Sequence, residues 1–132
     1  MQASKSQLRQ RLWRTYQALG RSLRTMSSEQ TMTPGSFYVL RRRCGKPTCR
    51  CARGQLHPVW VLSRREAGQR KLYSVAPTKR AHVRQLARTW RRVHRARAQF
   101  GKQSAALLAL ADELAQAQTV RWPELAARSC SR

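Results

Sequence analysis

This chain has very few acidic residues. Only 5 of its 132 residues are Asp or Glu, and Asp112 is the single aspartate. Two-metal nuclease chemistry needs several carboxylates around its ions, so an acidic nuclease or recombinase core is excluded. The sequence also lacks a Ser/His/Asp arrangement with an available acid and a phosphate-binding glycine loop. We therefore expect a protein that is not an enzyme; a tyrosine or serine nucleophile aided by arginines is the one alternative left open.

Long apolar runs are missing as well. No stretch approaches the roughly 18 apolar residues that read as a membrane span. The N-terminus has Lys5 but no uninterrupted apolar stretch of the kind a signal peptide contains. We expect a cytoplasmic protein without a membrane partner, associated with the nucleoid if it binds DNA. In a reducing cytoplasm, clustered thiols favour a metal site over disulfides.

Positive charge is what the chain has in excess. Its 28 basic residues give a formal net charge of +23, and all but five of them are arginine. Such a chain repels itself, and a polyanion relieves this repulsion because condensed counterions are released on binding. Arginine forks onto phosphates and stacks on bases. Nucleic acid is therefore the first candidate partner, and an anionic membrane surface is a weaker one.

Hydrophobic periodicity predicts an α+β fold that begins with a helix over residues 4–27. Its apolar residues alternate four and three apart, which is typical of a coiled-coil-like seam: Leu8, Leu12, Tyr16, Leu19, Leu23 and Met26. Runs rich in aromatic and β-branched residues then predict three strands, at residues 36–43, 58–65 and 70–76. A Gly-containing turn at residues 66–69 joins the last two strands into an antiparallel hairpin, and the first strand completes a three-stranded sheet.

A long C-terminal helix is expected next, with Thr78 as its N-cap. One seam position repeats every seven residues without a break: Leu86, Val93, Phe100, Leu107 and Leu114. The other contains Val83, Trp90 and Ala111 and is interrupted by Arg97 and Ser104. A strict seven-residue repeat favours a left-handed helix pair, so this helix is expected to pair with the N-terminal helix, within one chain or between chains. Gly101 could bend or divide it.

The expected organisation has three parts. Residues 1–30 contain the first helix. Residues 35–118 contain the sheet and the long helix and form one domain with the first helix. Residues 119–132 form a tail, in which residues 122–125 could dock as a single turn.

One short stretch has the spacing of a metal site. Residues 44–57 follow the pattern Cys-x4-Cys-x-Cys-x5-His and hold three of the four cysteines. Thiolate and imidazole ligands satisfy Zn²⁺ in a closed tetrahedron, and ligation supplies folding free energy that a small, highly charged sheet needs. We predict a structural Zn²⁺ bound by Cys44, Cys49, Cys51 and His57.

Several alternatives to this metal site remain. His82 or Cys130 could replace His57 as the fourth ligand. The cysteines could be free thiols, or Cys49 and Cys51 a redox pair, although no thioredoxin-like pattern surrounds them. A catalytic zinc would need an open coordination position and a nearby carboxylate base, and Glu66 is the only acid near these ligands in the sequence.

Three basic groups are candidates for nucleic-acid contact. The first follows the first strand and the presumed metal ligands: Arg41, Arg42, Arg43, Lys46, Arg50 and Arg53. The second lies on the hairpin: Arg64, Arg65, Arg70 and Lys71. The third lies on the long helix, where it could meet a phosphate backbone or a groove: Lys79, Arg80, Arg84, Arg88, Arg91, Arg92 and Arg95. The alternative for this third group is a helix face that is exposed to solvent and contacts no nucleic acid. Trp60 and Tyr73 could stack on bases or belong to the core.

The block Cys-Gly-Lys-Pro-x-Cys-x-Cys, followed by His57-Pro58, Trp-Val-Leu-Ser, a Gly turn and Val-Ala-Pro, resembles a family of small, poorly characterised bacterial and archaeal proteins. The resemblance covers residues 35–100 and implies the same four metal ligands and a loose association with mobile elements. This chain departs from the pattern at Pro58, which directly follows His57, and at Val59–Val61, where the family often has tyrosines. The order of strands and helix is also similar to the DNA-binding arm domains of tyrosine recombinases, which is an analogy of fold alone.

Together these features predict a zinc-containing protein that binds nucleic acid without chemistry. We expect DNA rather than RNA, and a role as an accessory subunit of a transposition or recombination complex. An RNA-binding component of a ribonucleoprotein is the second interpretation. The third is a protein–protein adaptor that uses its heptad helices. We also expect a larger protein partner, or a homodimer that forms through the helices.

Overall fold

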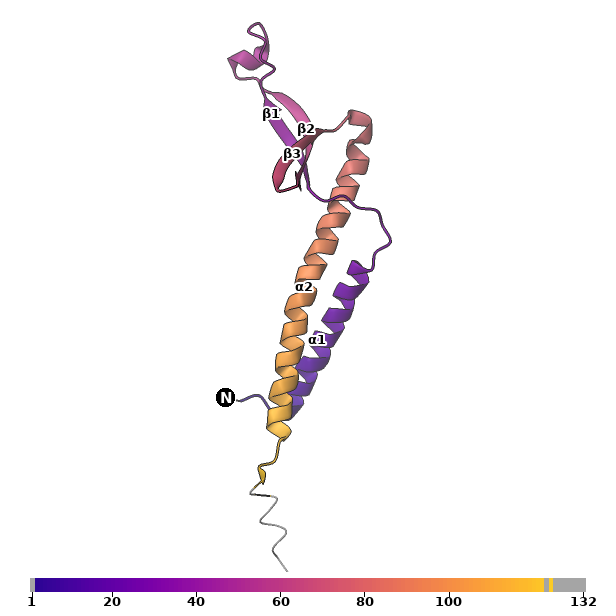
Figure 1. The fold of residues 1–132 in the computed structure, drawn as a ribbon, viewed down its shortest axis with the longest axis vertical. Helices are drawn as coiled ribbons and strands as arrows, with labels where there is room; N and C mark the ends of the chain where they lie inside the picture. The colour runs from indigo at the N-terminus through magenta and orange to yellow at the C-terminus, as the bar shows by residue number, and fades with distance from the viewer. Residues whose placement is uncertain (1, 123, 125–132) are drawn as a thin grey trace, which may run out of the picture. The chain divides into compact units, whose positions relative to one another are not determined.

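The structure is a computed structural model, and it describes residues 2–122 and 124. The main elements are α1 (Lys5–Met26), β1 (Ser36–Arg42), β2 (His57–Glu66), β3 (Gln69–Ser74) and α2 (Arg80–Gln118) (Figure 1). This order confirms the α+β class, the three-stranded antiparallel sheet and the long C-terminal helix. The turn expected at residues 122–125 lies partly outside the described residues.

The chain forms two compact units. The helical unit comprises the described parts of residues 1–27 and 96–132, and the sheet unit comprises residues 28–95. α2 contributes its first part to the sheet unit and its second part to the helical unit. We describe each unit by itself.

α1 begins at a complete capping box, which satisfies N–H groups that have no partner within the helix. The first turn contains no acidic residue. The Ser4 hydroxyl accepts a hydrogen bond from the Gln7 N–H at 3.2 Å, and the Gln7 side chain accepts one from the Ser4 N–H at 2.9 Å. The helix ends at Ser27, whose N–H donates to the Leu23 carbonyl at 2.9 Å. The start and end therefore agree with the helix expected over residues 4–27.

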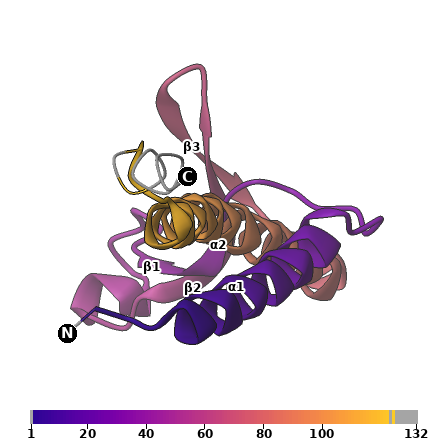
Figure 2. The same ribbon diagram turned by 90° about the horizontal axis from the view of Figure 1, so that it is seen from below.

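In the helical unit, α1 lies side by side with the second half of α2, in the opposite direction (Figures 1 and 2). One series of buried and half-buried residues on α1 runs four and three apart: Leu8, Leu12, Thr15, Leu19, Ser22 and Met26. The second half of α2 contains a series with the same spacing: Ala96, Phe100, Gln103, Leu107, Leu110 and Leu114. The Ser22 hydroxyl donates to Gln103 Oε1 at 2.9 Å, which joins the two seams. The expected pairing of the two helices is thus confirmed within one chain.

The expected seam was wrong at alternate positions. Tyr16 and Leu23 lie outside the packed face, with 57% and 49% of their surface exposed. Their places are taken by Thr15 and Ser22. On α2, Ala96 is buried in place of Arg97 and Leu110 in place of Ala111, whereas Gln103 and Ser104 are both half-buried. The packed face therefore contains polar residues such as Ser22 and Gln103, which a search for large apolar residues does not detect.

The sheet has the order β1-β2-β3, and both pairs are antiparallel. Val61 and Leu62 form its centre, with 0% and 9% of their surface exposed. Ala67 and Gly68 connect β2 to β3 with positive φ angles of 50° and 78°, which is the geometry of a two-residue type I′ turn. β3 pairs only with residues 61–66 of β2. Towards residues 43–56, which connect β1 to β2, the sheet therefore continues as a two-stranded ribbon of these two strands.

α2 begins differently from the expectation. Thr78 is not its N-cap; it lies inside a 3₁₀ turn, Pro77–Lys79, that precedes the helix. Proline suits the first position of a helical turn because its φ is already helical and its missing N–H needs no partner there. α2 then continues through Gly101 without a break, so the glycine does not divide it. In the sheet unit, Ala87 and Thr89 of α2 are buried, at 3% and 2% exposed.

Gly35 is the glycine that this fold most requires. Its φ is +123°, and a Cβ built there lies 2.5 Å from the carbonyl oxygen of Ser63 in β2. We expect Gly35→Ala to lower the free energy of unfolding by roughly 2–3 kcal/mol, because strain and a backbone clash combine. Urea denaturation measures this change. Gly20→Ala is the control, since its Cβ meets nothing within 4 Å and alanine is favoured in a helix by about 1 kcal/mol.

Candidate metal centre and basic surfaces

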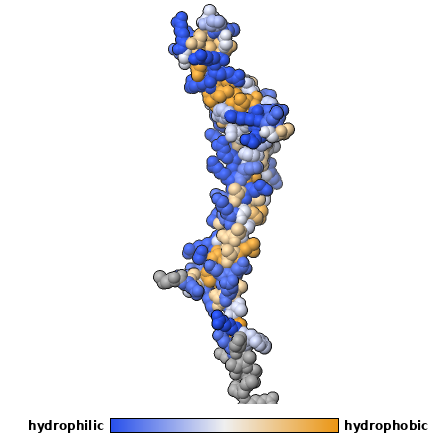
Figure 3. Space-filling model, turned by 60° about the vertical axis from the view of Figure 1, so that its left-hand side comes forward, coloured by the Kyte–Doolittle hydropathy of each residue, from blue (hydrophilic) through white to orange (hydrophobic). Residues whose placement is uncertain are grey.

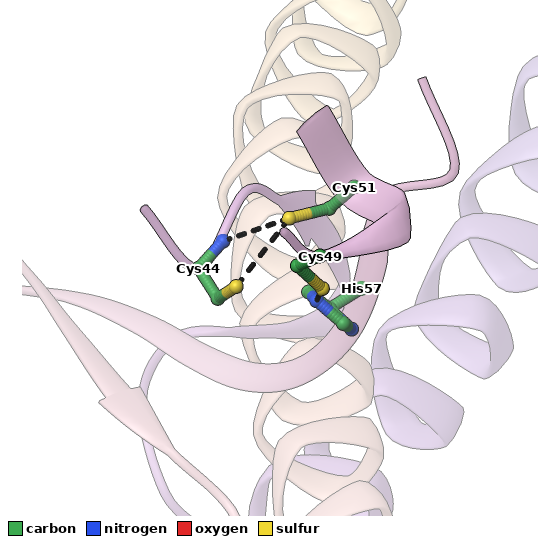
Figure 4. A group of neighbouring side chains, drawn as sticks. All are labelled: Cys44, Cys49, Cys51 and His57. Atoms are coloured by element: carbon green, nitrogen blue, oxygen red, sulfur yellow. Dashed lines mark hydrogen bonds between the residues drawn. The ribbon is translucent and has the colours of Figure 1, made fainter. Parts of the chain in front are cut away.

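The four residues expected to bind metal come together in space. The Sγ atoms of Cys44, Cys49 and Cys51 and a ring nitrogen of His57 all lie within 4.8 Å of one another. Cys44 Sγ is 3.4 Å from Cys51 Sγ, and Cys49 Sγ is 3.1 Å from His57 Nε2. The four side chains point toward a common centre (Figure 4).

The donor set and its spacing fit a tetrahedral metal ion. Zn–S bonds of about 2.3 Å place tetrahedral ligand atoms about 3.8 Å apart, which falls between the shortest and longest separations seen here. Three thiol groups and one imidazole form the Cys3His set of closed structural sites. The cluster could therefore hold a metal ion such as zinc. Its fourth member is His57 and not His82, while Cys130 lies outside the described residues.

The cluster forms where the β1–β2 ladder ends. Arg42 and His57 are the last paired residues of that ladder, so Cys44 follows the end of one strand while His57 begins the other. The chain between them makes a 3₁₀ turn, Arg50–Arg53, and Gly54 closes it with a φ of 106°. We call residues 43–56 the metal loop. It extends beyond the end of the sheet (Figure 1).

The loop's backbone favours a thiolate at Cys51, which is only 1% exposed. The Cys44 N–H donates to Cys51 Sγ at 3.3 Å. This bond, against the opposing effect of burial, and further bonds to Cys44, Cys49 and His57 lower the Cys51 pKa to about 7. At Cys44, a hydrogen bond from the Lys46 backbone lowers the pKa. The neighbouring thiols of Cys51 and Cys49 raise it by more, so the pKa of Cys44 lies above its usual value. The loop therefore favours the thiolate form of Cys51, which is the form that ligates a cation.

Two of the arginines predicted to contact DNA pack against the sheet. Phe37 and Trp60 stack with ring centroids 5.3 Å apart. The guanidinium groups of Arg80 and Arg84 lie over the Trp60 ring, each 5.4 Å from its centroid. These cation–π contacts join α2 to the sheet. Trp60 therefore belongs to the packed side of the sheet, whereas Tyr73 is 42% exposed. The sequence contained the alternating arginines but no sign of which would stack.

The hairpin cations also have partners. Glu66 pairs with Arg64 at 2.9 Å and with Lys71 at 3.1 Å, and it accepts a hydrogen bond from the Tyr73 hydroxyl at 2.7 Å. The Tyr73 bond, followed by Lys71, holds the pKa of Glu66 below its usual range. Arg70 donates to Ser63 at 3.0 Å and to Tyr38 at 2.6 Å. Arg65 is exposed. Most of the hairpin's predicted nucleic-acid contacts are therefore already engaged within the sheet.

Glu66→Gln tests this local neutralisation. We expect tighter binding to a polyanion at low salt, because Arg64 and Lys71 lose their common counter-charge. We also expect a lower Tm. Because its folded pKa is lowered, the ionised Glu66 stabilises the fold above its unfolded pKa, and this contribution is lost as pH falls through the folded value. The Tm difference from wild type should therefore disappear in acid. A thermal unfolding series across pH 3–7 measures it; a difference that persists in acid would contradict the prediction.

The remaining predicted contacts are exposed, and among the described residues ion pairs form only at Glu66. On α2, Arg92 donates to Gln30 at 2.8 Å. Its exposed neighbours Arg88, Arg91 and Arg95 follow three- and four-residue steps, which places them on one helix face. Lys79 precedes them. The ribbon and the metal loop carry the other exposed group: Arg41, Arg42, Arg43, Lys46, Arg50 and Arg53. Hydrophilic side chains gather around this tip in Figure 3.

The fold and the cluster define a class: a small α+β protein in which a Cys3His group ties the loop between two antiparallel strands. Residues 5–85 match the family described as "Domain of unknown function (DUF6788)", and the chain belongs to that family. Comparison with curated proteins and with solved structures gave no match. No helix in the described part of the chain has the length and apolarity needed to cross a membrane.

Proposed function

We propose that this protein binds duplex DNA without catalysing a reaction, and that a structural Zn²⁺ holds its metal loop. The observation that carries the proposal is the exposed row Arg88, Arg91 and Arg95 on α2. These residues span about 10 Å at 1.5 Å per residue. They have the same sign, and none of them takes part in an ion pair among the described residues. Bidentate arginines arranged in this way suit successive phosphate oxygens.

The metal cluster supports a structural role for zinc. Three thiolates and an imidazole fill the tetrahedron, so no position remains for a water or a substrate. Zinc bound by Cys44, Cys49, Cys51 and His57 would fix the loop in one conformation. The nearest acid in the sequence, Glu66, is already held by Lys71 and Tyr73, which supports the proposal that this protein is not an enzyme.

An accessory role in a transposition or recombination complex follows from the same features. The resemblance of the metal-loop motif to mobile-element companions supports this context, in which a larger enzyme would supply the chemistry that a chain with so few carboxylates does not. α1 offers a surface for such a partner, since Trp13 and Tyr16 are 63% and 57% exposed and lie edge to face with centroids 5.7 Å apart. A second copy of this chain is the alternative occupant.

A salt titration tests the proposed function. The affinity of the zinc-loaded chain for a short duplex DNA should fall steeply with salt, because each phosphate contact adds about 0.9 to the slope of log K against log[salt]. A duplex RNA of equal length is the competitor. If the chain prefers the RNA, a role in a ribonucleoprotein would replace the proposed DNA-binding role. If its affinity does not depend on salt, the protein–protein adaptor would be favoured.

A further inference from the structure

The metal loop differs from the other basic surfaces because its cations alternate with the ligands. Arg50 lies between Cys49 and Cys51, and Arg53 follows Cys51 in the same 3₁₀ turn. Both side chains are exposed, although Cys51 between them is buried. The position of each guanidinium group therefore depends on the backbone that the metal ligands hold.

The same turn presents a hollow of about 290 Å³ lined by Arg50, Arg53 and Gln55. Two guanidinium groups and a carboxamide offer only positive charge and hydrogen-bonding groups, and no acid lines it. Backbone bonds fix the three residues relative to one another: the Gln55 N–H donates to the Arg50 carbonyl at 3.3 Å, and the Gly54 N–H donates to the Cys51 carbonyl at 3.2 Å. The hollow suits a singly or doubly charged oxyanion such as a phosphate group.

The strands behind the loop place this hollow where DNA can reach it. β3 pairs with β2 only as far as Val61, whereas β1 and β2 remain paired to Arg42 and His57. The metal loop is thus the tip of a two-stranded ribbon, and a major groove admits a two-stranded ribbon. Arg41 and Arg42 add exposed positive charge along its sides.

We propose that the metal loop is itself a DNA-contacting finger, in which Arg50 and Arg53 clamp one backbone phosphate, so that metal binding and DNA binding stabilise each other. The inference rests on the proposed function and goes beyond it, because it assigns to the metal a second effect. The metal orders the clamp, and a phosphate in the clamp holds the turn that carries Cys51. Coupling of this kind is reciprocal, so each ligand changes the affinity for the other by the same factor.

The test follows zinc transfer from the full, zinc-loaded chain to a chromogenic chelator, with and without saturating short duplex DNA. We expect DNA to slow zinc release by roughly fivefold or more, and the chelator-stripped chain to bind the duplex more weakly. Arg50→Ala with Arg53→Ala should remove this effect of DNA on zinc release. Arg9→Ala with Arg24→Ala, on exposed positions of α1, removes the same charge and should retain it.

The outcomes separate the inference from the proposed function. If wild type does not bind the duplex, both fail. Suppose that wild type binds the duplex but that DNA leaves the rate of zinc release unchanged, with equal duplex affinity in the metal-loop and α1 double variants. In that case only the metal-loop clamp is wrong. Should the alanine variant lose zinc during purification, Arg50→Gln with Arg53→Gln keeps a polar, hydrogen-bonding side chain at both positions without the charge. Zinc release from that variant should not respond to DNA, and a response equal to wild type would overturn the clamp.

Discussion

Replacing Cys51 by serine is expected to abolish stable metal binding. Cys51 is the buried member of the cluster, at 1% exposed, and the Cys44 N–H points at its sulfur. Structural zinc sites in small peptides bind with about 10–16 kcal/mol of apparent free energy at neutral pH. An equal share for each of four ligands is about 3 kcal/mol, so the loss of one weakens zinc binding roughly a hundredfold to a thousandfold. Native mass spectrometry should show a chain that lacks one zinc.

The structural consequence should be local to the metal loop. The β1–β2 ladder ends at Arg42 and His57, and the buried centre of the sheet lies further along, at Val61 and Leu62. Hydrogen exchange should therefore accelerate in residues 43–56 of Cys51→Ser and stay slow in the centre of the sheet. Exchange that accelerates equally across the sheet would show that the metal holds the whole unit together.

Two control variants identify the fourth ligand. His57→Gln should lose zinc as Cys51→Ser does, since His57 Nε2 lies 3.1 Å from Cys49 Sγ. His82→Gln changes the same residue type at an exposed position of α2 and should keep zinc. Cys130→Ser removes the one cysteine outside the cluster and should keep it too. Loss of zinc in the last variant, with retention in His57→Gln, would reinstate the alternative ligand.

The second large effect is expected on α2. Arg88→Ala, Arg91→Ala and Arg95→Ala together should reduce the salt slope of duplex binding by about 2.7, at about 0.9 per phosphate contact. At 0.1 M salt this corresponds to a loss of affinity between about a hundredfold and about a thousandfold. The helix should stay folded, because alanine has the highest helix propensity and these side chains are exposed. Fluorescence anisotropy at several salt concentrations measures both quantities.

Two comparisons make this second prediction specific. The triple lysine variant at the same positions keeps the charge and should keep most of the salt slope, while it loses bidentate contacts and some affinity. Arg9→Ala, Arg21→Ala and Arg24→Ala on α1 remove equal charge from exposed positions. If this α1 variant loses as much slope as the α2 variant, binding follows net charge and the assigned surface on α2 is wrong.

Much of the fold could be predicted from the sequence, because its signals are local. The helical periodicity that starts at residue 4, the Gly-containing turn at residues 66–69 and the runs of aromatic and β-branched residues are each recognised within a few positions of the chain. Their positions agree with the observed start of α1 and the turn between β2 and β3. The metal cluster was predictable for the same reason: its ligands fall within fourteen residues, with glycines where the backbone must turn.

The errors arose where one segment had to be compared with another. Tyr16 and Leu23 satisfied a heptad pattern, but the packed face of α1 uses Thr15 and Ser22, and the Ser22 hydroxyl donates to Gln103 of α2. Arg80 and Arg84 looked equivalent to Arg88 and Arg91. Their separation into packed and exposed arginines depends on Phe37 and Trp60, which lie far away in the sequence.

The sequence by itself determined the elements, their order, the Cys3His cluster and the excess of positive charge, because each depends on local conformational preference or on composition. Tertiary structure alone decided which cations are available. Among the predicted contacts, Glu66 pairs with Arg64 and Lys71, and the Phe37–Trp60 stack holds Arg80 and Arg84. The row on α2 and the tip of the ribbon stay exposed. The physical reason is that a charge acquires its partner from whatever the fold brings within a few ångströms, and for side chains such as Arg80 that neighbour comes from a distant strand.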